Sequence, residues 1–76
     1  MPSAPPPDWV IARRRAVGDR IRVARLDRNF TQERLAERAG VDRQAINRIE
    51  QGHQSPKLDT LLLLADALGM PLSALV

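Results

Sequence analysis

Several residue types that carry chemistry are scarce in this chain. Its 76 residues include no cysteine, no tyrosine and a single histidine. Without cysteine there is no disulfide, no thiol nucleophile and no cysteine-based metal site. One imidazole leaves little for acid–base catalysis. We therefore expect a protein that is not an enzyme and that needs no cofactor, metal or small-molecule ligand.

Long hydrophobic runs are absent as well. No apolar segment approaches the roughly 20 residues needed to span a bilayer. The first eight residues carry four prolines and no basic residue, which is unlike a secretory signal. We therefore expect a cytoplasmic protein with no membrane partner. The composition, with 43% hydrophobic and 28% charged residues, is typical of one small globular domain.

Charge is unevenly distributed along the chain. The formal net charge is +3, and Lys57 is the only lysine among twelve basic residues. Residues 1–28 carry +4, residues 29–57 carry +1 and residues 58–76 carry −2. A basic front and an acidic, leucine-rich rear suggest two faces with different partners. Arginine suits phosphate and guanine, although a solvated arginine-rich helix explains the charge equally well.

Residue patterns predict an all-α fold with five helices and no strand. Residues 1–8 are expected to form a flexible, proline-rich arm, with Asp8 as the N-cap of a long first helix that ends near Arg28. Thr31 and Asp42 are N-cap types for the second and third helices. The fourth helix is expected over residues 58–68, before a glycine, and a short fifth helix over residues 70–76.

The most informative segment is residues 31–50, which predict two helices joined by a tight turn that contains Gly40. Small and apolar positions of both helices face inward. The second helix then directs four polar side chains outward: Arg43, Gln44, Asn47 and Arg48. Arginine can read guanine, and glutamine or asparagine can read adenine. A helix–turn–helix places such a helix in the major groove of DNA.

From about Val17 to Val76 the sequence resembles the helix–turn–helix domain of the Cro and C1 phage repressors and their bacterial relatives. The resemblance rests on small, apolar and glycine positions in register: Val17-Gly18, Ile21-Arg22, Thr31-Gln32, Leu35-Ala36, Ala39-Gly40-Val41, Ile46, Ile49-Glu50, Gly52, Pro56, Leu58, Leu61, Ala65 and Leu68-Gly69. It implies a five-helix, lambda-repressor-like DNA-binding domain over residues 9–76, with an extended first helix.

The resemblance also implies roles for individual residues. In this family, Gln32 binds a backbone phosphate and braces the first reading residue of the third helix, here Arg43. An internal ion pair is expected between Arg25 and Glu50, although Arg25 could instead contact phosphate. Such a pair fixes orientation more than it adds stability.

The sequence departs from the family pattern at two caps. Asp42 stands where serine or threonine is common; it can still cap the helix and can accept a hydrogen bond from cytosine N4. Lys57 stands where serine is frequent before the fourth helix, so we expect it to bind backbone phosphate together with Arg48. His53 is a further candidate for a phosphate contact, unless it is only solvated.

The rear of the domain carries more leucine than one core face needs. Leu58, Leu61, Leu64, Ala65 and Leu68 suffice for the core side of the fourth helix. The remaining apolar residues predict a homodimer interface: Leu63, Ala67, Leu72, Leu75 and Val76. The alternative is that Leu63 turns into a slightly rotated core. Trp9, at the start of the first helix, is expected to pack on a partner chain or a neighbouring helix.

The leading function is therefore a homodimeric regulator of transcription that binds a palindrome in double-stranded DNA, as a nucleoid-associated protein. Restriction–modification controllers and small phage-type repressors are the implied types. The rival function is an antitoxin whose main task is to neutralise a toxin protein. Glu33 and Glu37 lie on an exposed helix face that touches RNA polymerase in some relatives, or they pair with Arg34 or Arg38.

Overall fold

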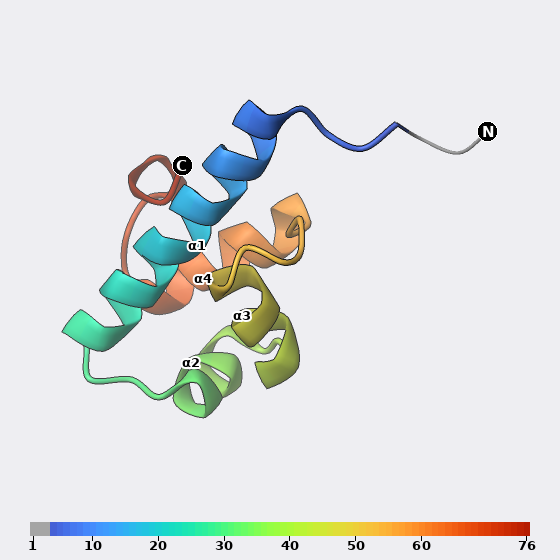
Figure 1. The fold of residues 1–76 in the computed structure, drawn as a ribbon. Helices are drawn as coiled ribbons and strands as arrows, with labels where there is room; N and C mark the ends of the chain where they lie inside the picture. Colours follow the sequence, from blue (N-terminus) through green and yellow to red (C-terminus); the bar gives the residue numbers. More distant parts are fainter. Residues whose placement is uncertain (1–3) are drawn as a thin grey trace.

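The computed structural model describes residues 4–76, and within them four α-helices are followed by one 3-10 turn. The elements are α1 (Asp8–Asp27), α2 (Gln32–Ala39), α3 (Arg43–Glu50), α4 (Leu58–Leu68) and η1 (Leu72–Ala74). The predicted all-α class is confirmed, and this part of the chain contains no strand. The long α1 extends beyond the other helices at its N-terminal end (Figure 1).

The second, third and fourth helices begin where the sequence predicts, and the second and fourth end at the expected glycines. The Thr31 hydroxyl accepts a hydrogen bond from the Arg34 backbone N–H at 3.0 Å, and the Asp42 carboxylate accepts one from the Gln44 N–H at 3.3 Å. Gly40 ends α2 with φ 71°, a conformation that a side chain would strain. The two N-caps predicted for α2 and α3 are thus confirmed.

Two predictions about the ends of the chain need correction. Asp8 is the first residue of α1 and Pro7 occupies the N-cap position, without a side-chain cap. The predicted fifth helix is only the 3-10 turn η1, which Pro71 precedes and i→i+3 hydrogen bonds close. Of the predicted arm, residues 1–3 lie outside the described part of the chain, and residues 4–7 are exposed without regular structure.

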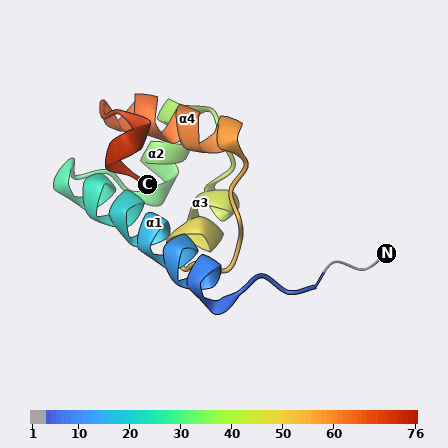
Figure 2. The ribbon, with the colours of Figure 1, turned by 90° about the horizontal axis from the view of Figure 1, so that it is seen from above.

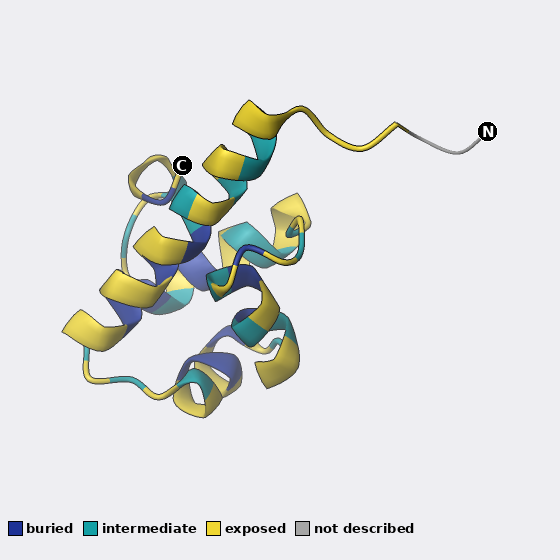
Figure 3. Cartoon of the chain, in the orientation of Figure 1, coloured by how far each residue is buried: buried dark blue, intermediate teal, exposed yellow. Residues whose placement is uncertain are grey.

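The core lies where the inner faces of the four helices meet. α1 packs on α3, α2 packs on α3 and on α4, and η1 covers the end of α4; Figure 2 shows α1 and α4 on opposite sides of this arrangement. Buried residues form the inner faces in Figure 3. The largest fully buried side chains are Ile21, Leu35, Ile46, Ile49, Leu64, Leu68 and Leu75.

α1 approaches α3 very closely at Gly18. A Cβ atom at this position would lie 2.1 Å from the carbonyl oxygen of Ile49 and 3.2 Å from the Cα of Glu50. The backbone of α1 therefore lies directly against the backbone of α3, and only glycine fits between them. This contact explains why a residue with poor helix propensity stands inside a 20-residue helix.

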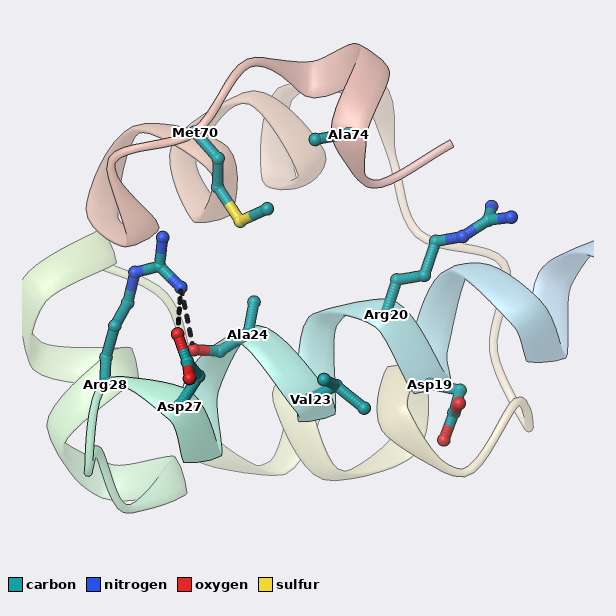
Figure 4. A pocket seen from close by; sticks show the side chains of 8 residues that line it. All are labelled: Asp19, Arg20, Val23, Ala24, Asp27, Arg28, Met70 and Ala74. Carbon is teal, nitrogen blue, oxygen red and sulfur yellow. Dashed lines mark hydrogen bonds and ion pairs between the residues drawn. The ribbon is translucent and has the colours of Figure 1, made fainter.

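A groove of about 440 Å³ runs between α1 and the C-terminal segment, on a surface separate from α2 and α3 (Figure 4). Ala24 and Met70 point into it. Arg28 closes one end, where its Nη1 donates to the Ala24 carbonyl oxygen at 3.0 Å and lies 4.0 Å from a carboxylate oxygen of Asp27.

Candidate nucleic-acid interface

The outer face of α3 is polar and accessible. Ile46 and Ile49 turn inward and are almost fully buried, so the helical repeat of 3.6 residues turns the polar side chains outward. Arg43, Gln44 and Arg48 are exposed, and Asn47 is half-buried between them. Asp42 is exposed at the N-terminal end of the same helix. The structure therefore gathers the predicted base-reading residues on one surface.

A buried ion pair fixes the C-terminal end of this helix. Arg25 of α1 donates from Nε to Glu50 Oε2 at 2.8 Å and from Nη2 to Oε1 at 3.0 Å. The side chains of Arg25 and Glu50 are only 10% and 3% exposed. The remaining terminal nitrogen of Arg25 donates to the Phe30 carbonyl oxygen at 2.7 Å. The pair implied by the family resemblance is thus present, and it joins α1, α3 and the residues before α2.

Gln32 braces α3, but at residues other than the expected one. Its amide nitrogen donates to Glu50 Oε1 at 3.2 Å and to Asn47 Oδ1 at 3.4 Å, and not to Arg43. The physical reason is that the buried carboxylate of Glu50 is a strong acceptor, which holds the NH₂ group of Gln32 on this side of α3. Gln32 and Arg43 still border one open depression of about 500 Å³ between the N-terminal ends of α2 and α3.

The family assignment follows from this geometry and from a direct comparison. A family model described as Helix-turn-helix, HTH_3, matches residues 21–75, which include all of α2, α3 and α4. The chain belongs to the helix-turn-helix family.

Two phage repressors are similar to this helix-turn-helix chain in sequence. The immunity repressor protein of Bacillus phage phi105 is 43% identical over 60 residues, which are 79% of this chain and 42% of that protein. The cryptic phage CTXphi transcriptional repressor RstR of Vibrio cholerae is 40% identical over 57 residues, 75% of this chain and 51% of the repressor. The chain thus spans about half the length of these curated relatives.

A solved structure matches nearly end to end. The restriction-modification controller protein C.AhdI of Aeromonas hydrophila has a TM-score of 0.83 and 32% sequence identity, over 86% of this chain and 98% of that protein. An HTH_3 family transcriptional regulator of Vibrio cholerae has a TM-score of 0.81 and 25% identity, over 86% of this chain and 36% of its own length.

The residues predicted to contact the DNA backbone lie around the C-terminal end of α3. Arg48 is exposed on α3, and His53 and Lys57 are exposed in the connection to α4. Lys57 is exposed at the N-cap position of α4, where its ammonium group has no acceptor with which to cap the helix. Gln32 differs from these three residues, because its amide hydrogens are engaged within the protein.

For the acidic residues of α2, the alternative prediction is pairing with Arg34 or Arg38 of the same helix, and it holds for Glu37. Arg34 Nη1 donates to Glu37 Oε2 at 3.3 Å, one turn apart on the exposed face. Glu33 is exposed and borders the depression beside Gln32 and Arg43. Pairing within the helix therefore accounts for Glu37.

The apolar surface at the rear differs from the predicted set. Leu63 is 46% exposed, so it has not turned into the core, and Val76 is exposed as well. Leu75 is fully buried in its own domain, which removes it from any interface. Two leucines that sequence reasoning missed are exposed on a neighbouring face of α4, one turn apart: Leu62 is 47% exposed and Leu58, predicted as core, is 61% exposed.

The run of four leucines at residues 61–64 is the sequence signal that some leucines of α4 are exposed. Because successive residues of a helix are turned by about 100°, residues 61–64 cannot all face one core. Ala67, one turn after the exposed Leu63, is half-buried, and so is Leu72 at the start of η1.

Three further features bear on partners. Trp9 is 69% exposed at the start of α1, so no neighbouring helix of its own domain covers it. Across residues 4–76, no helix is long and apolar enough to cross a membrane. The same residues bring no three histidine or acidic side chains together as metal ligands.

Proposed function

We propose that this chain is a transcriptional regulator that binds a specific sequence in double-stranded DNA. The observation that carries the proposal is the outer face of α3, where Arg43 and Gln44 are exposed on a helix whose other end is fixed by the Arg25–Glu50 pair. A rigid helix with base-reading side chains fits the major groove. Arg48, His53 and Lys57 then contact phosphates on either strand.

The regulator acts as a homodimer on a palindromic operator. A single domain of this size buries only about 600–1,000 Å² on DNA, and useful specificity calls for two copies. Leu63, Ala67, Leu72 and Val76 form the dimer interface, since these apolar residues lie on the least basic part of the chain. Two such domains would place their α3 helices in successive major grooves about 34–36 Å apart.

Restriction–modification controllers and phage-type repressors are the kinds of regulator that the proposal favours. The likeness to a controller protein that this chain covers almost completely supports the former, and the sequence identity to two phage repressors supports the latter. Either kind works in the cytoplasm, at the nucleoid. A contact with RNA polymerase through Glu33 and Glu37 belongs to the proposal as well: Glu33 is exposed, and Glu37 pairs only with the exposed Arg34 of its own helix.

Selection of bound sites from random DNA tests the proposal. We expect an enriched half-site repeated with two-fold symmetry at a fixed spacing. Arg43→Ala should lose about 1–3 kcal/mol on that site and relax the preference at one position. Arg22→Ala, at an exposed arginine of α1, is the matched control and should keep the preference. Equal losses on selected and random DNA for Arg43→Ala would reject the assignment.

A further inference from the structure

A series of hydrogen bonds with a fixed direction runs from the core to the outer face of α3. It begins at the carboxylate of Glu50, whose side chain is only 3% exposed. An ionised carboxylate can only accept hydrogen bonds. Arg25 donates to both of its oxygens. Gln32 donates to Oε1 as well, at 3.2 Å. The charge of Glu50 therefore determines which end of the Gln32 amide faces α3.

The direction passes from Gln32 to Asn47. Because the NH₂ group of Gln32 must face the carboxylate, the same nitrogen also faces Asn47, and Asn47 has to present its oxygen at 3.4 Å. Gln51, one turn further along, donates from its amide nitrogen to the same Asn47 oxygen at 3.3 Å. Two donors occupy the two lone pairs of that oxygen. Asn47 is thus left with only its NH₂ group for an outside partner.

A donor-only amide changes what Asn47 can read. An asparagine reads adenine by donating to N7 and accepting from N6, which needs both ends of the amide. Guanine presents two acceptors, O6 and N7, in the major groove. We propose that Asn47 reads guanine through its NH₂ group, in place of the adenine expected from its residue type, and that Gln51 is the positioning residue that holds it in this orientation. This inference rests on the proposed function.

The substitution Asn47→Asp gives the sharpest test. One carboxylate oxygen of the aspartate would still accept from Gln32 and Gln51, and the other would face the groove as an acceptor. The preferred base at the position read by residue 47 should change from guanine to cytosine, whose N4 amino group donates. The ratio of affinities for the two operators should reverse by about ten-fold or more. The ratio, not the affinity, is the readout, because a new negative charge weakens binding to all DNA.

Gln51 is tested by the same ratio. Gln51→Ala should lower the wild-type preference for guanine over adenine at this position by about ten-fold, towards equal binding. Gln51→Lys should keep the preference, since lysine can donate to the Asn47 oxygen, although its charge raises affinity for every sequence. Gln54→Ala removes a nearby glutamine that takes no part in these hydrogen bonds and should change nothing. A purely structural role for Gln51 would make the alanine and lysine variants alike.

The outcomes separate this inference from the proposed function. If the wild-type protein selects no DNA sequence, both fail. Suppose instead that it selects a half-site with adenine at the position read by Asn47, and that replacing this adenine by unsubstituted purine, which lacks the N6 amino group, weakens binding. Only the inference then fails, because Asn47 uses its oxygen to accept from N6. An unchanged base preference in Asn47→Asp overturns it in the same way. Thermal unfolding of each variant establishes that the compared proteins are folded.

Discussion

Gly18 sets the distance between α1 and the proposed reading helix, and replacing it by alanine tests that role directly. The added Cβ would lie 2.1 Å from the Ile49 carbonyl oxygen and 3.1 Å from the carbonyl carbon. Relief to an ordinary contact of about 3.4 Å needs the two backbones to separate by about 1.3 Å. Both obstructing atoms belong to the backbone, so no side-chain rotation can make the room.

Two effects of opposite sign decide the magnitude. Alanine is a better helix former than glycine by about 1 kcal/mol, which favours the variant. Overpacking a filled contact costs about 1–3 kcal/mol, and the shift also disturbs Ile49 and the adjacent Glu50, which the buried ion pair holds. We expect the second effect to win, with a net loss of up to about 2 kcal/mol from overpacking alone. In a domain of this size each kcal/mol lowers Tm by roughly 4–8 °C.

The measurement is thermal unfolding followed by circular dichroism. Val23→Ala is the matched control, because Val23 lies on α1, is 56% exposed and gains helix propensity without a steric conflict. We expect the control to stay within about 0.5 kcal/mol of the wild-type protein. A Gly18→Ala protein with a Tm at or above that of the wild type would show that the two backbones do not meet at this position.

Three further predictions concern affinity, assembly and the buried pair. With about six to ten phosphate contacts per dimer, operator affinity should fall roughly 10³–10⁵-fold between 50 and 200 mM salt in a titration; a nearly flat response would point to a protein partner. Leu63→Glu should give a monomer by sedimentation, whereas Leu62→Glu, at a residue of nearly equal exposure that is turned about 100° away from Leu63 on the same helix, should stay dimeric; a dimeric Leu63→Glu protein would place the interface elsewhere. Glu50→Ala should cost about 3–5 kcal/mol in denaturant unfolding because it leaves the Arg25 charge buried, and the double variant Arg25→Met, Glu50→Leu should recover most of that loss; an unaffected single variant would contradict the burial.

Local patterns in the sequence predict most of the fold. The caps at Thr31 and Asp42 and the glycine ends of α2 and α4 are set by interactions within a few residues, so they can be read without knowing the tertiary structure. The 3-10 turn after Pro71 is different. Whether those residues form an α-helix or a tighter turn depends on how the chain packs against α4, which directs Leu75 into the core.

The candidate site divides in the same way. The outward positions of Arg43 and Gln44 follow from the helical repeat alone. The partners of Gln32 do not, because they depend on a carboxylate 18 residues away that becomes buried only when α1, α2 and α3 meet. The orientation of the Asn47 amide, and with it the role of Gln51, is a property of that tertiary contact and has no local signal beyond the four-residue spacing.

The first turn of α3 carries exposed side chains without partners among these hydrogen bonds, and its second half carries Asn47, which other side chains hold. The two halves would therefore evolve at different rates. Arg43 and Gln44 are exposed, and their side chains join none of the hydrogen bonds that hold the helix in place. Exchanging them should change unfolding free energy by less than about 0.5 kcal/mol, so new operator preferences can arise there one substitution at a time. Asn47 shares its oxygen with Gln32 and Gln51, so a change there is tolerated best when a neighbour changes too. Among descendants of one ancestor, preferences read by the first turn of α3 should therefore diverge early, and those read by its last turn should diverge late and in correlated steps.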